Sequence, residues 1–277
     1  MGGILTRYEA YLRLGFGVVD TSASIKEAIR SMYLEGVEYL AIVDEEERLV
    51  GIVSVRDIAR RIMEFFEESS IVEFPGFKLV LSEPLTSIAR KPEIVLSEES
   101  SFKEALRIIV EKGVGFVPIV RGGKLRGGYT ELHAALLLLG SSKPALEYAT
   151  PNPVWGDSSQ PLIEALGFML SKGFRRIPLS RDGEIYLASM HKLLYVMAKA
   201  RSVEGLIANV VEAAASAIVL EEPSLSLVAE TILAVPERAV LLREKGTGKI
   251  YIMTESDLAR AAQDAIEDGE ASWSIVL

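Results

Sequence analysis

Apolar and polar positions along this chain follow a pattern that recurs four times. In the first copy, Ser24 precedes apolar residues at helical spacing, and Glu27 completes the sequence of a capping box. Two short apolar runs on either side of a charged turn then predict a hairpin. Ser54 follows the hairpin and begins a second helix, which is expected over 57–66. Each copy is therefore predicted to contribute an entry strand, a helix, a hairpin and a closing helix.

The other three copies repeat this order. Their first helices are expected over 102–111, 162–171 and 225–234. A polar motif opens each closing helix, and its four versions are Ser54-Val55-Arg56-Asp57, Thr130-Glu131-Leu132-His133, Ser189-Met190-His191-Lys192 and Thr254-Glu255-Ser256-Asp257. The period of roughly 60 to 75 residues is too long for a solenoid of helix pairs and too short for independent domains. Each copy is therefore expected to bury its apolar face against a sister copy.

Three stretches lie outside the simple repeat. The sequence of 140–144 is the best linker candidate, and we place the main boundary there. Residues 69–90 are longer than a connection needs and predict a small insertion. The alanine-rich stretch 210–217 predicts a helix of small residues packed on a neighbour, and Trp155 is expected in the core or at an interface.

Composition narrows the possible chemistry. The 277 residues include no cysteine and two histidines, so a cysteine or histidine-rich metal site is excluded, and none is predicted. A formal net charge of −9 argues against a nucleic-acid binder that works by broad phosphate neutralisation. No apolar run approaches the ~20 residues of a membrane span, and no targeting segment is visible, so a cytoplasmic protein without membrane contact is expected. No nucleophile–base pair or phosphate-cradling loop can be assembled, so we predict no catalytic residue and no enzyme.

With these motifs in view, the chain resembles the CBS (cystathionine-β-synthase) domain family. The glycine-to-proline motif lies at 113–119 and 173–179, and the motif ending in Ser-x-x-Asp lies at 50–57. The resemblance implies an α+β fold of four β-α-β-β-α repeats, paired into two pseudo-symmetric modules. The first pair is expected over 1–140, with repeats at about 15–68 and 91–140. The second is expected over 141–277, with repeats at about 149–200 and 210–266.

In this family a module often binds an adenosine-containing ligand between its two repeats. The resemblance assigns the ribose to the Asp of one repeat, the phosphate to the adjacent Ser or Thr and nearby cations, and the adenine to the proline strand of the other repeat. Here the Asp is kept only in repeats one and four, with His133 and Lys192 in its place in two and three. The proline strand is kept only in two and three. Each module is therefore expected to retain one intact site.

The two expected sites draw on both repeats of a module. One comprises Ser54, Arg56, Asp57, Gly115, Phe116, Val117 and Pro118, and the other comprises Phe174, Arg175, Arg176, Ile177, Pro178, Thr254 and Asp257. An ionised carboxylate can accept from both ribose hydroxyls, and each such bond is worth about 1.5–3 kcal/mol. The second site is expected to bind more tightly, because two arginines lie on its adenine strand. As an alternative, both aspartates occupy a position where Asp commonly serves only as a helix cap.

The resemblance implies a regulatory protein that senses AMP, ADP, ATP or S-adenosylmethionine, and we expect it to need no cofactor, to form a homodimer and to act on a protein partner. Two alternatives remain at this point: an interaction module that binds no nucleotide, and a nucleic-acid-binding protein. His133 and His191 are expected to have structural roles, because no partner ligands accompany them.

Overall fold

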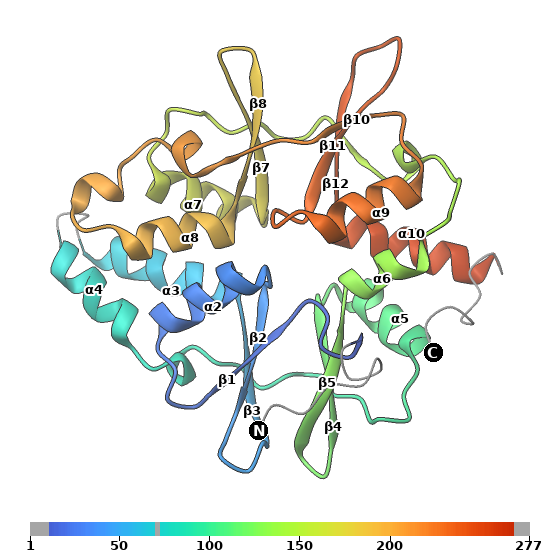
Figure 1. Ribbon diagram of the computed structural model, residues 1–277. Helices are drawn as coiled ribbons and strands as arrows, with labels where there is room; N and C mark the ends of the chain where they lie inside the picture. Colours follow the sequence, from blue (N-terminus) through green and yellow to red (C-terminus); the bar gives the residue numbers. More distant parts are fainter. Residues whose placement is uncertain (1–10, 70–72, 269–277) are drawn as a thin grey trace.

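The computed structural model describes residues 11–69 and 73–268. Four hairpins point outward in two pairs, and the helices lie between the pairs across the middle of the molecule (Figure 1). The predicted α+β class and the four-repeat organisation are confirmed. Repeat one contains β1 (Gly17–Asp20), α2 (Ile25–Glu35), β2 (Tyr39–Val43), β3 (Leu49–Ser54) and α3 (Val55–Glu68). Repeat two contains α5 (Phe102–Lys112), β4 (Phe116–Arg121), β5 (Lys124–Thr130) and α6 (Leu132–Leu137).

The second half of the chain repeats the plan. Repeat three contains β6 (Thr150–Pro151), α7 (Leu162–Lys172), β7 (Arg176–Arg181), β8 (Glu184–Ser189) and α8 (Met190–Lys199). Repeat four contains β9 (Ala215–Ser216), β10 (Val219–Glu221), α9 (Leu225–Ala234), β11 (Ala239–Arg243), β12 (Ile250–Thr254) and α10 (Glu255–Glu267). Short 3₁₀ helices span Leu85–Ser87, Ala145–Glu147, Val203–Gly205 and Val210–Ala213.

The helix boundaries follow the local signals in the sequence. The predicted capping box of α2 is present, since the Glu27 carboxylate accepts from the Ser24 N–H (2.8 Å) and the Ser24 hydroxyl accepts from the Glu27 N–H (3.3 Å). Gly36 ends the helix with φ +62°, a left-handed conformation that glycine adopts without a Cβ penalty. Equivalent glycines end α5 and α7.

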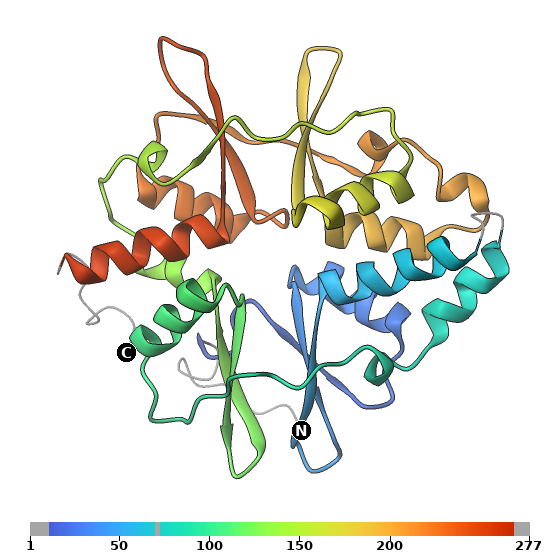
Figure 2. The ribbon, with the colours of Figure 1, turned by 180° about the vertical axis from the view of Figure 1, so that it is seen from behind.

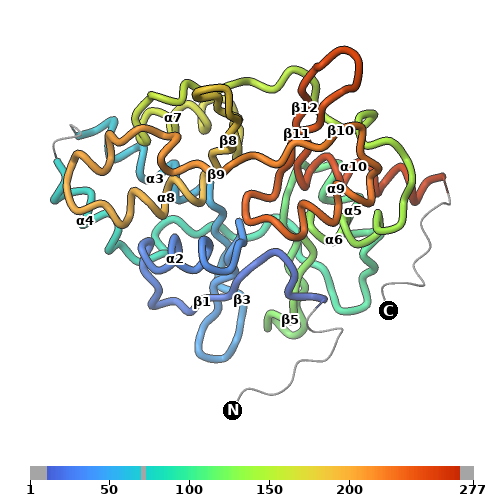
Figure 3. Tube along the Cα trace, turned by 45° about the horizontal axis from the view of Figure 1, so that its top comes forward, coloured from blue at the N-terminus to red at the C-terminus, as the bar shows by residue number. Residues whose placement is uncertain are grey.

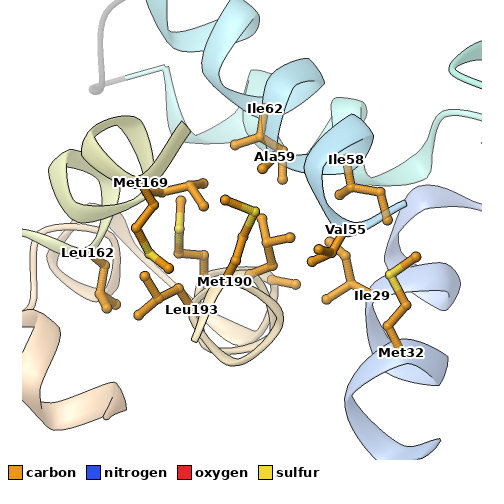
Figure 4. Packing of buried hydrophobic residues seen from close by; sticks show 14 of the residues in the cluster. Ile29, Met32, Val55, Ile58, Ala59, Ile62, Leu162, Met169, Met190 and Leu193 are labelled. Atoms are coloured by element: carbon orange, nitrogen blue, oxygen red, sulfur yellow. The ribbon is translucent and has the colours of Figure 1, made fainter. Parts of the chain in front are cut away.

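The two large hydrophobic clusters each combine a repeat from the first half of the chain with one from the second. One joins repeats one and three, where Ile58 and Ile62 of α3 face Met169 of α7 and Met190 of α8 (Figure 4). The other joins repeats two and four. A smaller cluster of Phe16, Ala41, Ile52 and Phe116 lies between repeats one and two. The boundary near residue 140 stays a prediction, because both large cores run across it.

Residues 69–90 contain the predicted insertion, the helix α4 (Phe74–Ser82). Its Phe77 and Leu81 are buried in the first cluster. The Lys78 ammonium donates to the Ala200 carbonyl (2.6 Å) just beyond the end of α8. The insertion thus covers one end of the core shared by repeats one and three.

Two expectations were wrong. Residues 210–217 form a 3₁₀ turn followed by β9, because Ala215 and Ser216 pair with Leu187 and Tyr186 of β8 and so satisfy their backbone in a sheet. For Trp155 only the core position was wrong, since the residue is 40% exposed, and a position at an interface stays a prediction.

Candidate functional site

In each repeat pair, two segments cross from the hairpin of one repeat to the hairpin of the other. Residues 90–96 begin beside Ile52 of β3, whose N–H donates to the Arg90 carbonyl (2.9 Å), and end where the Leu96 N–H donates to the Pro118 carbonyl of β4 (2.9 Å). Residues 150–156 begin as β6 beside β12, and their Gly156 N–H donates to the Pro178 carbonyl of β7 (2.9 Å). Both crossings lie on the face shown in Figure 2, together with α3, α5, α7 and α10. We call this the aspartate face.

The 150–156 crossing connects the two parts of the predicted tighter site. Thr254 is the last residue of β12 and the N-cap of α10. Its N–H and hydroxyl both donate to Asp257 Oδ2, at 2.7 and 2.9 Å. Arg260 pairs with the other carboxylate oxygen. Burial raises the pKa of Asp257, whose side chain is 5% exposed. The predicted ribose acid is thus held on the end of one repeat, and the crossing leads from there to the proline strand of the other.

Asp57 has the same local geometry in repeat one. Its Oδ2 accepts from the Ser54 N–H (2.8 Å) and hydroxyl (2.7 Å), and Arg90 Nε of the 90–96 crossing lies 3.6 Å away. Both aspartates therefore cap their own helices, and their predicted contact with ribose stays a prediction. Capping occupies Oδ2, while Asp57 Oδ1 faces Arg60, which is 61% exposed.

The opposite face, which carries α2, α6, α8 and α9, has two crossings of its own (Figure 1). We call it the histidine–lysine face. His133 Nε2 donates to the Tyr11 carbonyl (2.8 Å), and His133 Nδ1 accepts from the Thr130 N–H (3.0 Å), which fixes the tautomer. Lys192 Nζ donates to the Ala214 carbonyl (3.3 Å). On this face the residue that replaces Asp fastens the crossing segment to the helix.

A buried ion cluster at the centre joins all four repeats. Arg175 of repeat three pairs with Glu38 of repeat one and with Glu131 of repeat two (2.8 Å), and it donates to Ser256 of repeat four (3.1 Å). Arg176 pairs with Glu38 (2.8 Å) and with Glu255 (3.1 Å). The Arg175 and Arg176 side chains are 8% and 2% exposed. We call the five charged residues the central cluster: Arg175, Arg176, Glu38, Glu131 and Glu255.

Two carboxylates of the central cluster, Glu38 and Glu255, have pKa values shifted in opposite directions. Burial opposes ionisation of Glu38, but Arg175 and Arg176 outweigh it and lower the pKa of Glu38. Burial raises the pKa of Glu255 to about 7, against the opposing effect of Arg176. Arg176 Nη2 is thus engaged by two carboxylates while its Nε donates to the Glu237 carbonyl, and its predicted contact with phosphate stays a prediction.

A pocket of about 260 Å³ opens beside the cluster and is lined by residues of all four repeats. Three arginines line it, Arg56, Arg175 and Arg260, against one carboxylate, Glu131. Arg56 Nη2 donates to the Gly173 carbonyl (2.6 Å), and its buried Nε has no partner among the described residues. Burial, followed by repulsion from Arg175, lowers the pKa of Arg56. An anion in this central pocket would favour the charged form of Arg56 against both burial and the repulsion from Arg175.

The central pocket lies between the two aspartate sites. Arg56 is the second residue of α3, between Ser54 and Asp57, while Arg260 lies one turn after Asp257. Its lining helices α3, α5 and α10 all belong to the aspartate face (cyan, green and red in Figure 2). Of the predicted site residues, the structure therefore brings Arg56, Gly115 and Arg175 into one pocket.

The strand residues of the predicted sites take different positions. Val117 and Ile177 are core residues, 1% and 0% exposed. Phe116 stacks on Phe16, with 4.6 Å between ring centroids, and Phe174 packs against the core of repeats one and three. The carbonyls of Pro118 and Pro178 already accept from the crossing segments. Pro118 and Pro178 are themselves buried, and the predicted contact of these strands with adenine stays a prediction.

Sequence reasoning missed Glu38, Glu131, Glu255 and Arg260. A usable signal was present, because Glu38 and Arg175 occupy the same position in repeats one and three, two residues after the glycine that ends the first helix. Opposite charges at equivalent positions of packed repeats indicate a contact. Glu131 and Glu255 follow Thr130 and Thr254, which occupy equivalent motif positions in repeats two and four.

Comparison with known proteins identifies the repeats. The model of the CBS domain matches residues 16–64 and 85–132. These two stretches are CBS domains. Repeats three and four share their architecture, and the whole arrangement resembles the crystal structure of protein MJ1225 from Methanocaldococcus jannaschii. That match has a TM-score of 0.70 at 21% identity, and covers 88% of this chain and 95% of that one.

Other relatives agree on the fold. A conserved protein from Pyrococcus horikoshii matches with a TM-score of 0.55 at 17% identity, over 88% of this chain and 94% of its own. Among curated proteins, MJ1404 of M. jannaschii is 30% identical over 115 residues, which is 41% of this chain and 27% of MJ1404. A 33.4 kDa protein of Thermofilum pendens is 25% identical over 183 residues, covering 60% of this chain and 56% of its own length. The chain thus spans less than two thirds of these two curated relatives.

Over residues 11–69 and 73–268, no helix is both long enough and apolar enough to cross a membrane. Within the same ranges, no group of three or more His, Asp or Glu side chains is arranged to hold a metal ion.

Proposed function

We propose that this CBS-domain protein is a regulatory sensor that binds an adenine nucleotide or a related adenosyl compound on its aspartate face. The main support is the central pocket, in which Arg56, Arg175 and Arg260 lie between the two capping aspartates. A ribose held by Asp257 or Asp57 would direct its phosphates toward these cations. Arginine suits this role because its planar fork can engage two phosphate oxygens.

The similarity to MJ1225 supports the proposal, since that protein is described as a proposed archaeal homologue of γ-AMPK. The asymmetry of the two faces supports it further. Aspartate, which only accepts, is kept where a ribose would donate, while His133 and Lys192 close the other two crossings. No catalytic step is part of the proposal. A bound ligand would shift the equilibrium between arrangements of the four repeats, and a partner protein would read that shift.

Calorimetric titration with AMP, ADP, ATP and S-adenosylmethionine tests the proposal. We expect Asp257→Asn to weaken the tighter event by about 10-fold to 100-fold, the cost of about 1.5–3 kcal/mol for a lost charged hydrogen bond. Asp57→Asn should weaken the second event and leave the first unchanged. Trp155 lies on the 150–156 crossing and is 40% exposed, so its fluorescence in a Trp273→Phe background should report the Asp257 event.

The capping geometry favours a second candidate function, an interaction module without nucleotide affinity, because both aspartates already have local partners. The two functions predict different results in the titrations of the parent protein and the Asn variants. For a pure interaction module, Asp257→Asn would lower the melting temperature, and none of the four ligands would release heat with the parent protein. Heat from the parent that is unchanged in both variants would show that binding occurs elsewhere.

A further inference from the structure

A groove of about 600 Å³ runs between α2 and α8, at a distance in sequence and space from the aspartate crossings. Ile29 and Ala198 form part of its floor, and Leu34 on its rim is 61% exposed. The Leu34 side chain is therefore an apolar surface beside a concave site. The groove lies on the histidine–lysine face, where α2 and α8 pack side by side (Figures 1 and 3).

The groove is positively charged. Lys26 and Arg30 of α2 and Lys199 of α8 line it, and within residues 11–69 and 73–268 none of the three has a carboxylate within ion-pairing distance. The one acid in the lining, Glu27, is engaged by the Ser24 N–H and hydroxyl. Burial, followed by repulsion from Lys26, lowers the pKa of the neighbouring Lys78. Unpaired cations on an acidic protein of net charge −9 mark a surface for an anionic partner.

The chain contains a matched groove whose cations and carboxylates balance. Between α5 and α10, Ser101, Lys103, Glu104, Leu106 and Arg107 line an equivalent groove of about 350 Å³, at the positions that Ser24, Lys26, Glu27, Ile29 and Arg30 occupy in α2. There the second helix contributes Gln263 and Glu267 in place of Ala198 and Lys199. The α2–α8 groove has three cations and one carboxylate, whereas the α5–α10 groove has two cations and two carboxylates.

Two other occupants fit the α2–α8 groove poorly. A nucleobase would need an open aromatic face, but the Tyr195 ring is stacked on Tyr33 (3.8 Å between centroids), and Lys199 Nζ lies 4.8 Å from its centroid. A second copy of this chain would bring its own net charge of −9 toward the first, and like-charged bodies repel. An acidic segment with one apolar side matches both the cations and Leu34.

We infer that the α2–α8 groove is a docking site for an acidic amphipathic helix of a partner protein. Its apolar side chains would lie on Ile29, Ala198 and Leu34, and its carboxylates would pair with Lys26, Arg30 and Lys199. A helix laid between two helices buries its apolar stripe in this way. The inference is independent of the nucleotide sites and stands or falls without them.

The test uses a fluorescein-labelled peptide of about 15 residues, built from Glu, Ala and Leu with one apolar stripe, and the full-length protein. Fluorescence anisotropy should show binding that weakens as NaCl rises from about 0.05 to 0.5 M. K26E/R30E should weaken binding about tenfold or more, while the matched pair K103E/R107E should stay within about twofold. A peptide with Lys in place of Glu should not bind. Thermal melting confirms folding, and Lys199→Glu provides an independent variant should the double variant unfold.

Several results would overturn the inference. They are no binding of the acidic peptide to the parent, equal loss in both double variants, or displacement of the peptide by a single-stranded RNA. A change of oligomeric state in K26E/R30E, measured by light scattering, would assign the groove to a second copy of the chain instead.

Discussion

On the aspartate face, the residue three positions after the N-cap is a carboxylate that points at its own helix start and at an arginine. On the histidine–lysine face, the equivalent residue is His133 or Lys192, and it donates to a carbonyl of the crossing segment. A carboxylate cannot make that bond because it only accepts. One position in one motif thus decides whether the side chain at the helix start donates to a carbonyl of the crossing or accepts from its own N-cap.

The differences in sequence among the repeats follow the two faces of the molecule. Repeats one and four are neighbours through neither of the large hydrophobic clusters, yet their aspartates lie on the same face, and Arg56 and Arg260 from their closing helices line the same pocket. In repeats two and three, His133 and Lys192 bind the crossing segments of the opposite face. The central cluster lies between the faces, so a change there would act on both.

The largest effect is expected from Arg175→Met, which removes the cation shared by repeats one, two and four. Glu131 would lose its cation and Glu38 would keep only Arg176, and breaking one side of a buried ion pair costs about 3–5 kcal/mol. Urea unfolding measures this loss. The control is Arg48→Met, whose ion pairs with Asp44 and Glu46 are exposed and worth at most about 1 kcal/mol. Equal stability of the two variants would mean that the cluster does not hold the faces together.

A smaller effect is expected from His133→Leu on the histidine–lysine face. The Tyr11 carbonyl and the Thr130 N–H would both lose a buried partner, at a cost of about 1–3 kcal/mol at pH 7. Burial lowers the pKa of His133 from 6.5 to about 4. The unfolded state therefore takes up a proton first, and the parent should lose stability as the pH falls from 6.5 through 4.

The leucine variant should show a shallower decline over this range, measured by thermal melting at a series of pH values. His191 shares the direction of the shift, so part of the slope should remain. The pKa of Glu255 is raised to about 7, and its contribution has the opposite sign, declining as the pH rises toward 7. An unchanged slope in His133→Leu would assign the acid sensitivity to His191 and other groups.

Much of the fold could be predicted because its signals are local. Ser24, Glu27 and Gly36 specify a helix through contacts within one turn, and the expected bounds of the first helices agree with the structure to within a residue or two. The four motif copies also predicted the pairing of repeats. That pairing places the acid of one repeat and the proline strand of the other at the two ends of one crossing.

The parts that could not be predicted depend on contacts between distant segments. Helix amphipathicity marks an apolar face but not its partner, so the packing of repeat one on repeat three was not foreseen. The alanines of 210–217 favour a helix locally, and pairing with β8 overrides that preference. Arg175 and Arg176 looked like free phosphate ligands because Glu38 and Glu255 are remote in sequence.

The smallest effect is expected from Lys192→Met, which removes one hydrogen bond of 3.3 Å to the Ala214 carbonyl and costs about 0.5–1.5 kcal/mol. Lys192→Asp should cost more, because its carboxylate would face that carbonyl with no proton to donate. It would also place an aspartate at a crossing whose opposite strand has Leu241 where the aspartate sites have proline. If the proline strand is needed, Lys192→Asp should gain no nucleotide binding by calorimetry. A new binding event in this variant would show that the acid alone makes a site, and that the lysine alone keeps this face closed.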